Sequence, residues 1–133
     1  MTEPPAIAIY KWLVEAINNI GIKTYSASQS VPQYLPVCRV QLLTSNPTLQ
    51  YRNAREYSYS FQIDVIDAQN KLTRSLTNAY QIIGLCRKAA VPGYVVGING
   101  EPGLTSMVDT STSQTLNRQI IRVNYNVIED TVY

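Results

Sequence analysis

The chain has 133 residues, of which 45% are hydrophobic and 15% charged, and its net charge is +2. This length predicts one domain spanning residues 1–133, and the apolar content argues against a disordered chain. Histidine is absent, which excludes Ser-His-Asp and Cys-His catalytic sites within one chain and removes the commonest neutral metal ligand.

The first predicted element is an amphipathic helix that begins at Pro4-Pro5 and ends at Gly21. Proline suits a first helical turn because that turn needs no amide donors, and glycine is a common helix stop. Helical spacing predicts a buried face of Ala6, Ile9, Leu13, Ala16, Ile17 and Ile20. Glu3, Lys11 and Glu15 argue against a signal peptide, and no segment approaches the roughly 20 apolar residues of a membrane span. We therefore expect a soluble protein made in a cytoplasm.

The next segments predict a short strand at residues 22–26, a loop at 27–36 and a second strand at 37–43. Residues 44–56 contain Pro47 and predict a long connection to the strand that follows. Long connections inside compact domains are usually functional or mobile. We therefore expect residues 44–56 to be an arm that contacts a partner.

Residues 57–67 form the clearest pattern in the chain, YSYSFQIDVID. Apolar and polar residues alternate, which predicts a strand with one buried and one polar face. A helix follows, with Asp67 or Asn70 as its expected cap and Pro92-Gly93 as its end. Its predicted buried stripe is Leu72, Leu76, Ala79, Ile83 and Cys86, with Tyr80 and Ala90 beside it.

The last third of the chain predicts strands at residues 94–98, 104–113 and 118–129, separated by turn signals such as Asn99-Gly100 and Pro102-Gly103. Consecutive strands are expected to form antiparallel hairpins. The predicted fold class is α+β: a mostly antiparallel sheet with two helices packed on one face.

Two features bear on chemistry. Cys38 and Cys86 are expected to be buried free thiols, with a disulfide as the alternative. A two-metal nuclease would require several carboxylates to converge at strand ends. The candidates for such a cluster are Asp64, Asp67, Asp109, Glu129 and Asp130. Asp64 is expected in mid-strand and Asp67 at a helix start, so we expect no catalytic, metal or cofactor site.

The order of elements resembles the small tail-terminator (tail-completion, head–tail joining) proteins of long-tailed bacteriophages. The resemblance covers nearly the whole chain. It rests on the amphipathic first helix, the aromatic strand that ends in Ile63-Asp64-Val65, and the helix run LTNAYQIIGLC. It also rests on a polar hairpin containing Asp109 and on the last strand, LNRQIIRVNYNV, which opens near Arg118.

The resemblance implies a structural virion protein rather than an enzyme. Members of that family form a hexameric ring on the head-proximal end of the tail tube, stop tube elongation and dock onto the head connector or head-closure protein. DNA passes through the ring without specific binding. The resemblance thus implies a location in the phage tail or neck, after assembly in the host cytoplasm, and no membrane partner.

Because the family has no transferable contact motif, contact residues are inferred from this chain. For inter-subunit or tube contact we expect Tyr51, Arg52 and Arg55 in the 44–56 segment, and Arg118 and Arg122 on the polar face of the last strand. Three other functions stay open: another neck or head-closure adaptor, a metal-dependent nuclease, and a small cellular adaptor domain.

Overall fold

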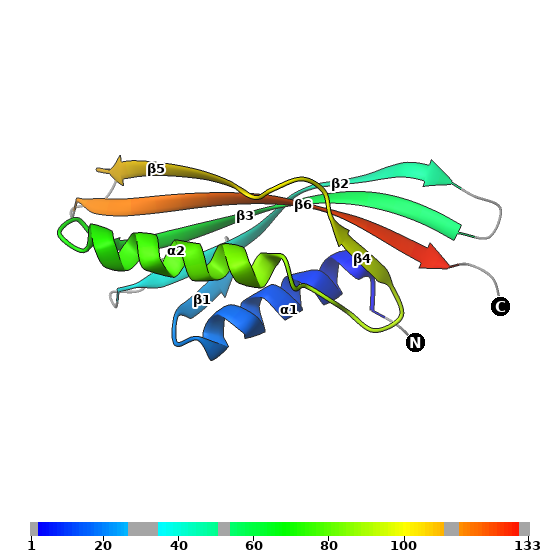
Figure 1. Ribbon diagram of the computed structural model, residues 1–133, viewed down its shortest axis with the longest axis horizontal. Coiled ribbons are helices and arrows are strands. Elements are labelled where there is room, and N and C mark those ends of the chain that lie inside the picture. The colour runs from blue at the N-terminus through cyan, green and yellow to red at the C-terminus, as the bar shows by residue number, and fades with distance from the viewer. Residues whose placement is uncertain (1–2, 27–34, 51–53, 111–114, 131–133) are drawn as a thin grey trace.

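The computed structural model describes residues 3–26, 35–50, 54–110 and 115–130, which form two helices and a six-stranded sheet (Figure 1). The elements in chain order are α1 (Pro5–Asn19), β1 (Lys23–Ser26), β2 (Val37–Gln50), β3 (Ala54–Ala68), α2 (Leu72–Cys86), β4 (Val95–Ile98), β5 (Gly103–Asp109) and β6 (Leu116–Asp130). Both helices lie on the same face of the sheet, and among the described residues no helix covers the other face (Figure 1). The expected α+β class is confirmed.

The sheet runs in the order β1-β2-β3-β6-β4, and β5 also pairs with β6. Four of the five pairings are antiparallel, but β1 and β2 run parallel. The expectation that consecutive strands form hairpins is therefore wrong in two places. β1 and β2 are parallel, and β4 and β5 pair with β6 rather than with each other.

The predicted long connection at 44–56 is also wrong for its described residues. β2 continues to Gln50 and β3 begins at Ala54, so these residues extend a strand pair. Two register shifts, at Leu42/Thr44 and Pro47/Leu49, interrupt the pairing of β2 with β3. Bulges of this kind let a strand accommodate a proline and bend without losing its partner.

The main core lies between the sheet and the two helices. α1 contributes Ile9, Leu13 and Ile17, each fully buried, whereas the expected Ile20 is 39% exposed. Gly21, at φ 92°, ends this helix as predicted. The alternating residues of β3 and β6 complete the core with Tyr59, Phe61, Ile63, Val65, Ile121, Val123, Tyr125 and Val127.

The buried stripe of α2 is rotated from the predicted one. Its buried residues are Ser75, Ala79, Ile82 and Cys86. Leu72 and Leu76 were expected inside but are 47% and 40% exposed. The capping prediction is wrong as well, because Lys71 occupies the N-cap position without a side-chain cap hydrogen bond. The helix ends at Cys86, before Pro92-Gly93.

A second, smaller cluster lies on the helix-free face. It joins Val37 of β2, Ile66 of β3 and Leu116 of β6, with Tyr25 and Leu35 packed against it. Because Val37 and Ile66 are fully buried, this end of the sheet is apolar on both faces. The strict alternation expected along residues 57–67 therefore breaks at Ile66.

Candidate functional surfaces

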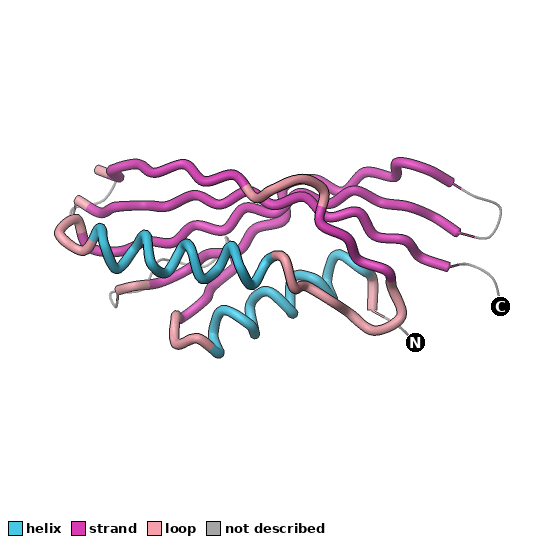
Figure 2. The backbone as a smooth tube through the Cα atoms, viewed as in Figure 1, coloured by secondary structure: helices cyan, strands magenta, loops and turns pink. Residues whose placement is uncertain are grey.

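The sheet is longer than the two helices that cover it. At one end the tips of β2, β3 and β6 project past both helices (Figure 2). We call this projection the arm, and it comprises residues 49–50, 54–56 and 128–130. In the register, Arg55 lies opposite Gln50 of β2 and opposite Glu129 of β6. The arm presents paired strands to its surroundings, which is a rigid way to offer a contact surface.

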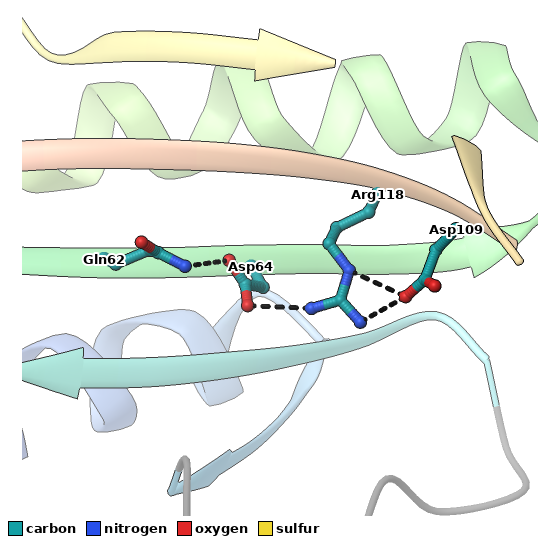
Figure 3. Close-up of polar contacts among 4 residues, drawn as sticks. All are labelled: Gln62, Asp64, Asp109 and Arg118. Carbon is teal, nitrogen blue, oxygen red and sulfur yellow. Dashed lines mark hydrogen bonds and ion pairs between the residues drawn. The ribbon is translucent and has the colours of Figure 1, made fainter. Parts of the chain in front are cut away.

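An ion-pair network occupies the helix-free face near the other end of the sheet (Figure 3). Arg118 of β6 donates from Nη1 to Asp64 of β3 at 2.9 Å and from Nη2 to Asp109 of β5 at 2.6 Å. A further bond from Arg118 Nε reaches Asp109 at 3.1 Å, and Gln62 donates to Asp64 at 3.0 Å. One guanidinium thus links three strands.

This network is poorly accessible to solvent. Side-chain exposure is 17% for Arg118, 12% for Asp64 and 8% for Asp109. Carboxylates withdrawn from water are tolerated when a paired cation and hydrogen bonds compensate them. Asp64 and Asp109 therefore hold an arginine between strands, which gives Arg118 a role inside the subunit that the sequence did not reveal.

The other acidic residues of the predicted nuclease cluster lie elsewhere. Asp67 is fully buried on the helix face, where it accepts a bond from Arg74 Nε at 2.7 Å. Glu129 lies opposite Arg55, whereas Asp64 lies opposite Ile120. That register spacing along β6 corresponds to about 30 Å at the usual rise of a strand. Within the described ranges, no group of three or more metal-binding side chains is found.

The structure separates the residues predicted to make contacts. Arg55 and Arg122 are exposed, Arg55 on the arm and Arg122 in the middle of β6 between Gln62 and Gly103. Arg118 lies on the same face of β6 as Arg122, but it is engaged with Asp64 and Asp109. Tyr51 and Arg52 fall outside the described residues, so their predicted role stays a prediction.

Both cysteines are free and buried, as expected. Burial, with a contribution from the charge of Asp64, raises the pKa of the Cys38 thiol. Burial also raises the pKa of Cys86 to about 11. Tyr125 donates its hydroxyl to the Cys86 carbonyl at 2.7 Å, and burial raises its pKa too. These groups stay protonated at neutral pH, which makes them structural rather than nucleophilic.

A shallow groove of about 370 Å³ lies between α1 and the segment that follows α2. Trp12 and Lys11 line one side, and Val91, Pro92 and Tyr94 line the other. Tyr94 donates its hydroxyl to the Glu3 carbonyl at 2.6 Å, which fixes the start of the chain against this groove.

Comparison with known proteins supports the fold alone. No protein-family model and no curated protein matches the chain. One solved structure, of a protein whose name states no function, is 17% identical over 92% of each chain, with a TM-score of 0.58. At that identity the likeness concerns architecture alone. Among the described residues, neither helix has the length and apolar character needed to cross a bilayer.

Proposed function

We propose that this protein is a tail terminator of a long-tailed bacteriophage, which caps the head-proximal end of the tail tube as a hexameric ring and joins the tail to the head. The resemblance described above supplies this identification. The fold is compatible with it, since two helices and a mixed, mainly antiparallel sheet give the roughly α+β architecture expected from the order of elements.

The arm is the observation that most supports an assembly role. Its three paired strand ends extend beyond the helical layer (Figure 2), and Arg55, Ile128 and Glu129 lie outside the main core. A ring subunit needs heterologous contacts on two sides and separate surfaces above and below. A projecting arm that carries the exposed Arg55 is suited to reach a neighbouring subunit or the tube.

The surface composition also favours assembly. Only 15% of the residues are charged, and ten tyrosines are present. Charged residues are depleted and tyrosine enriched at interface cores. A net charge of +2 is also compatible with a lumen that lets DNA pass without retaining it.

The proposal is tested by adding the purified protein to its tail-tube protein during polymerisation and examining the products by negative-stain electron microscopy. A tail terminator is expected to form closed rings with a central hole at one end of each tube and to limit tube length. A protein that leaves tubes uncapped but binds the isolated head connector would instead be a neck or head-closure adaptor. Binding to neither would refute both assignments.

A further inference from the structure

The free edges of the sheet are protected to different degrees. Unpaired strand edges are templates for pairing, and proteins usually block them with short strands, lysine, proline or bulges. β1 and β4 have four residues each, and β1 contains Lys23. The outer edge of β2 carries Pro47 and two register shifts.

β5 has none of these devices. It is seven residues long, GLTSMVD, without lysine, proline or an irregular register against β6. Among the described residues, its other edge has no strand partner. Its single charged residue, Asp109, is engaged with Arg118.

Apolar side chains flank this edge. Leu104 and Val108 of β5 are 45% and 56% exposed. They lie on the helix face of the sheet, since Leu104 pairs with the buried Ile121. α2, which packs on β6 and β3, adds an apolar stripe at helical spacing, with Leu72 47%, Leu76 40% and Tyr80 78% exposed. An open strand edge and an apolar helix flank thus border one surface.

We propose that β5 pairs with β5 of a second copy of this chain, antiparallel, about a two-fold axis that passes beside Ser106. The two sheets then continue into each other, and the two α2 helices face one another across the paired β5 strands. This inference does not rest on the proposed function. A ring requires heterologous contacts, and the two-fold contact would be additional to them.

The sequence of β5 is complementary to itself in this register. Leu104 lies opposite Val108 of the partner subunit on the helix face, and the two-fold axis repeats this pair. The two apolar pairs lie on the same face of the sheet as α2. Cross-strand pairs of this kind are the unit of sheet stabilisation. Asp109 lies opposite Gly103 of the partner subunit, so no like charges meet. This self-complementarity is why we assign the edge to a second copy rather than to an unrelated strand.

Analytical ultracentrifugation of the full chain tests the association. We expect a mass of twice 14.9 kDa for the wild type at high micromolar concentration. Val108→Lys should shift it to the monomer, because two lysines would enter the apolar interface. Val95→Lys is the matched control, since Val95 is 66% exposed on β4, and it should leave the dimer intact. Circular dichroism checks that each variant folds. A wild-type monomer throughout, or loss of the dimer in the control alone, would overturn the proposal.

Cysteine cross-linking tests the register separately. Ser106→Cys should form a disulfide between two copies, because directly opposed residues lie about 4.5–5.5 Å apart. Leu104→Cys should not, since the two substituted positions would lie four residues out of register. Cross-linking of Leu104→Cys alone would refute the register. If the protein formed rings without the two-fold contact, ultracentrifugation would give masses above that of a dimer and Ser106→Cys would form no disulfide. That outcome would refute the two-fold contact and leave the proposed function intact.

Discussion

Arg118 illustrates how a single residue can look like a surface cation in the sequence and act inside the fold. Its guanidinium bridges Asp64 and Asp109, both largely withdrawn from water. Removing one member of a buried ion pair leaves an uncompensated charge, which is costly. We expect Arg118→Leu to lower the free energy of unfolding by about 3 kcal/mol, measured by urea denaturation.

Two comparisons make this prediction specific. Arg122→Leu changes the same residue type on the same face of β6, but at an exposed position, and should stay within about 0.5 kcal/mol of the wild type. Asp64→Asn should cost less in the Arg118→Leu background than in the wild type, because the charge it removes is already unpaired. Equal costs in both backgrounds would show that Asp64 and Arg118 are not coupled.

The buried thiols predict a loss of stability in alkali. Burial raises the pKa of Cys38 and Cys86 above the ordinary value of 9.0, so the unfolded chain releases these protons first. The contribution of these thiols to the free energy of unfolding should therefore be constant below about pH 8.5 and fall above pH 9, by up to about 1.4 kcal/mol per pH unit for each thiol. Tyr125 should add to the fall above pH 10, because its pKa is raised as well.

Urea denaturation between pH 8 and pH 10.5 measures this slope. Cys38→Ala removes one of the two thiols and should reduce the slope near pH 9.5 by about half. The slope is measured within one variant across pH, so the stability lost to the cavity at Cys38→Ala does not change it. A slope unchanged by the substitution would mean that the Cys38 thiol titrates alike in both states.

At the scale of elements, α2 shows where helical periodicity misleads. The large apolar residues Leu72 and Leu76 suggested a stripe that the structure instead leaves half exposed, while Ser75 is buried. Ile82→Ala should therefore cost about 2–4 kcal/mol, since it opens a cavity under the helix. Leu76→Ala in the same helix should cost less than about 1 kcal/mol. Urea denaturation measures the free energy of unfolding of the two variants. A larger loss of stability for Leu76→Ala than for Ile82→Ala would show that the predicted stripe, not the observed one, is buried.

The strands show which parts of a fold local patterns specify. The buried alternation at Tyr59, Phe61 and Ile63 was predictable, because one face of β3 packs on the helices. The continuation of β2 through Pro47 was not, because its turn-forming residues are held in a strand by pairing with β3. The parallel β1–β2 pairing likewise depends on the route of the chain, which side-chain periodicity does not encode.

The interactions of Asp64, Asp109 and Arg118 were beyond sequence reasoning for a related reason. The three residues lie on β3, β5 and β6, and only the order of these strands in the sheet brings them together. Asp64 was correctly placed in mid-strand on the face opposite the main core. Its partners were hidden because Arg118 is 54 residues away in the chain.

At the scale of the whole molecule, the arm connects the fold with the proposed assembly. If it contacts a neighbouring subunit or the tube, Arg52→Glu combined with Arg55→Glu should abolish ring assembly and leave the subunit folded. At the position that the structure describes, Arg55, the substitution places a like charge opposite Glu129, which costs at most about 1 kcal/mol in a cross-strand pair. So small a loss of stability would not prevent assembly. A reversed charge at an interface would, because it is repelled by the groups that bound the original charge.

The matched control reverses the same number of charges away from the arm. Lys71 and Lys88 are exposed at the two ends of α2, and Lys71→Glu combined with Lys88→Glu should leave assembly intact. Negative-stain microscopy with tail tubes scores ring formation, and urea denaturation confirms that both double variants remain folded. Rings formed equally by both would remove the arm from the interface. If neither double variant formed rings, the cause would be the net charge of the chain, which both variants lower equally from +2, and not the arm.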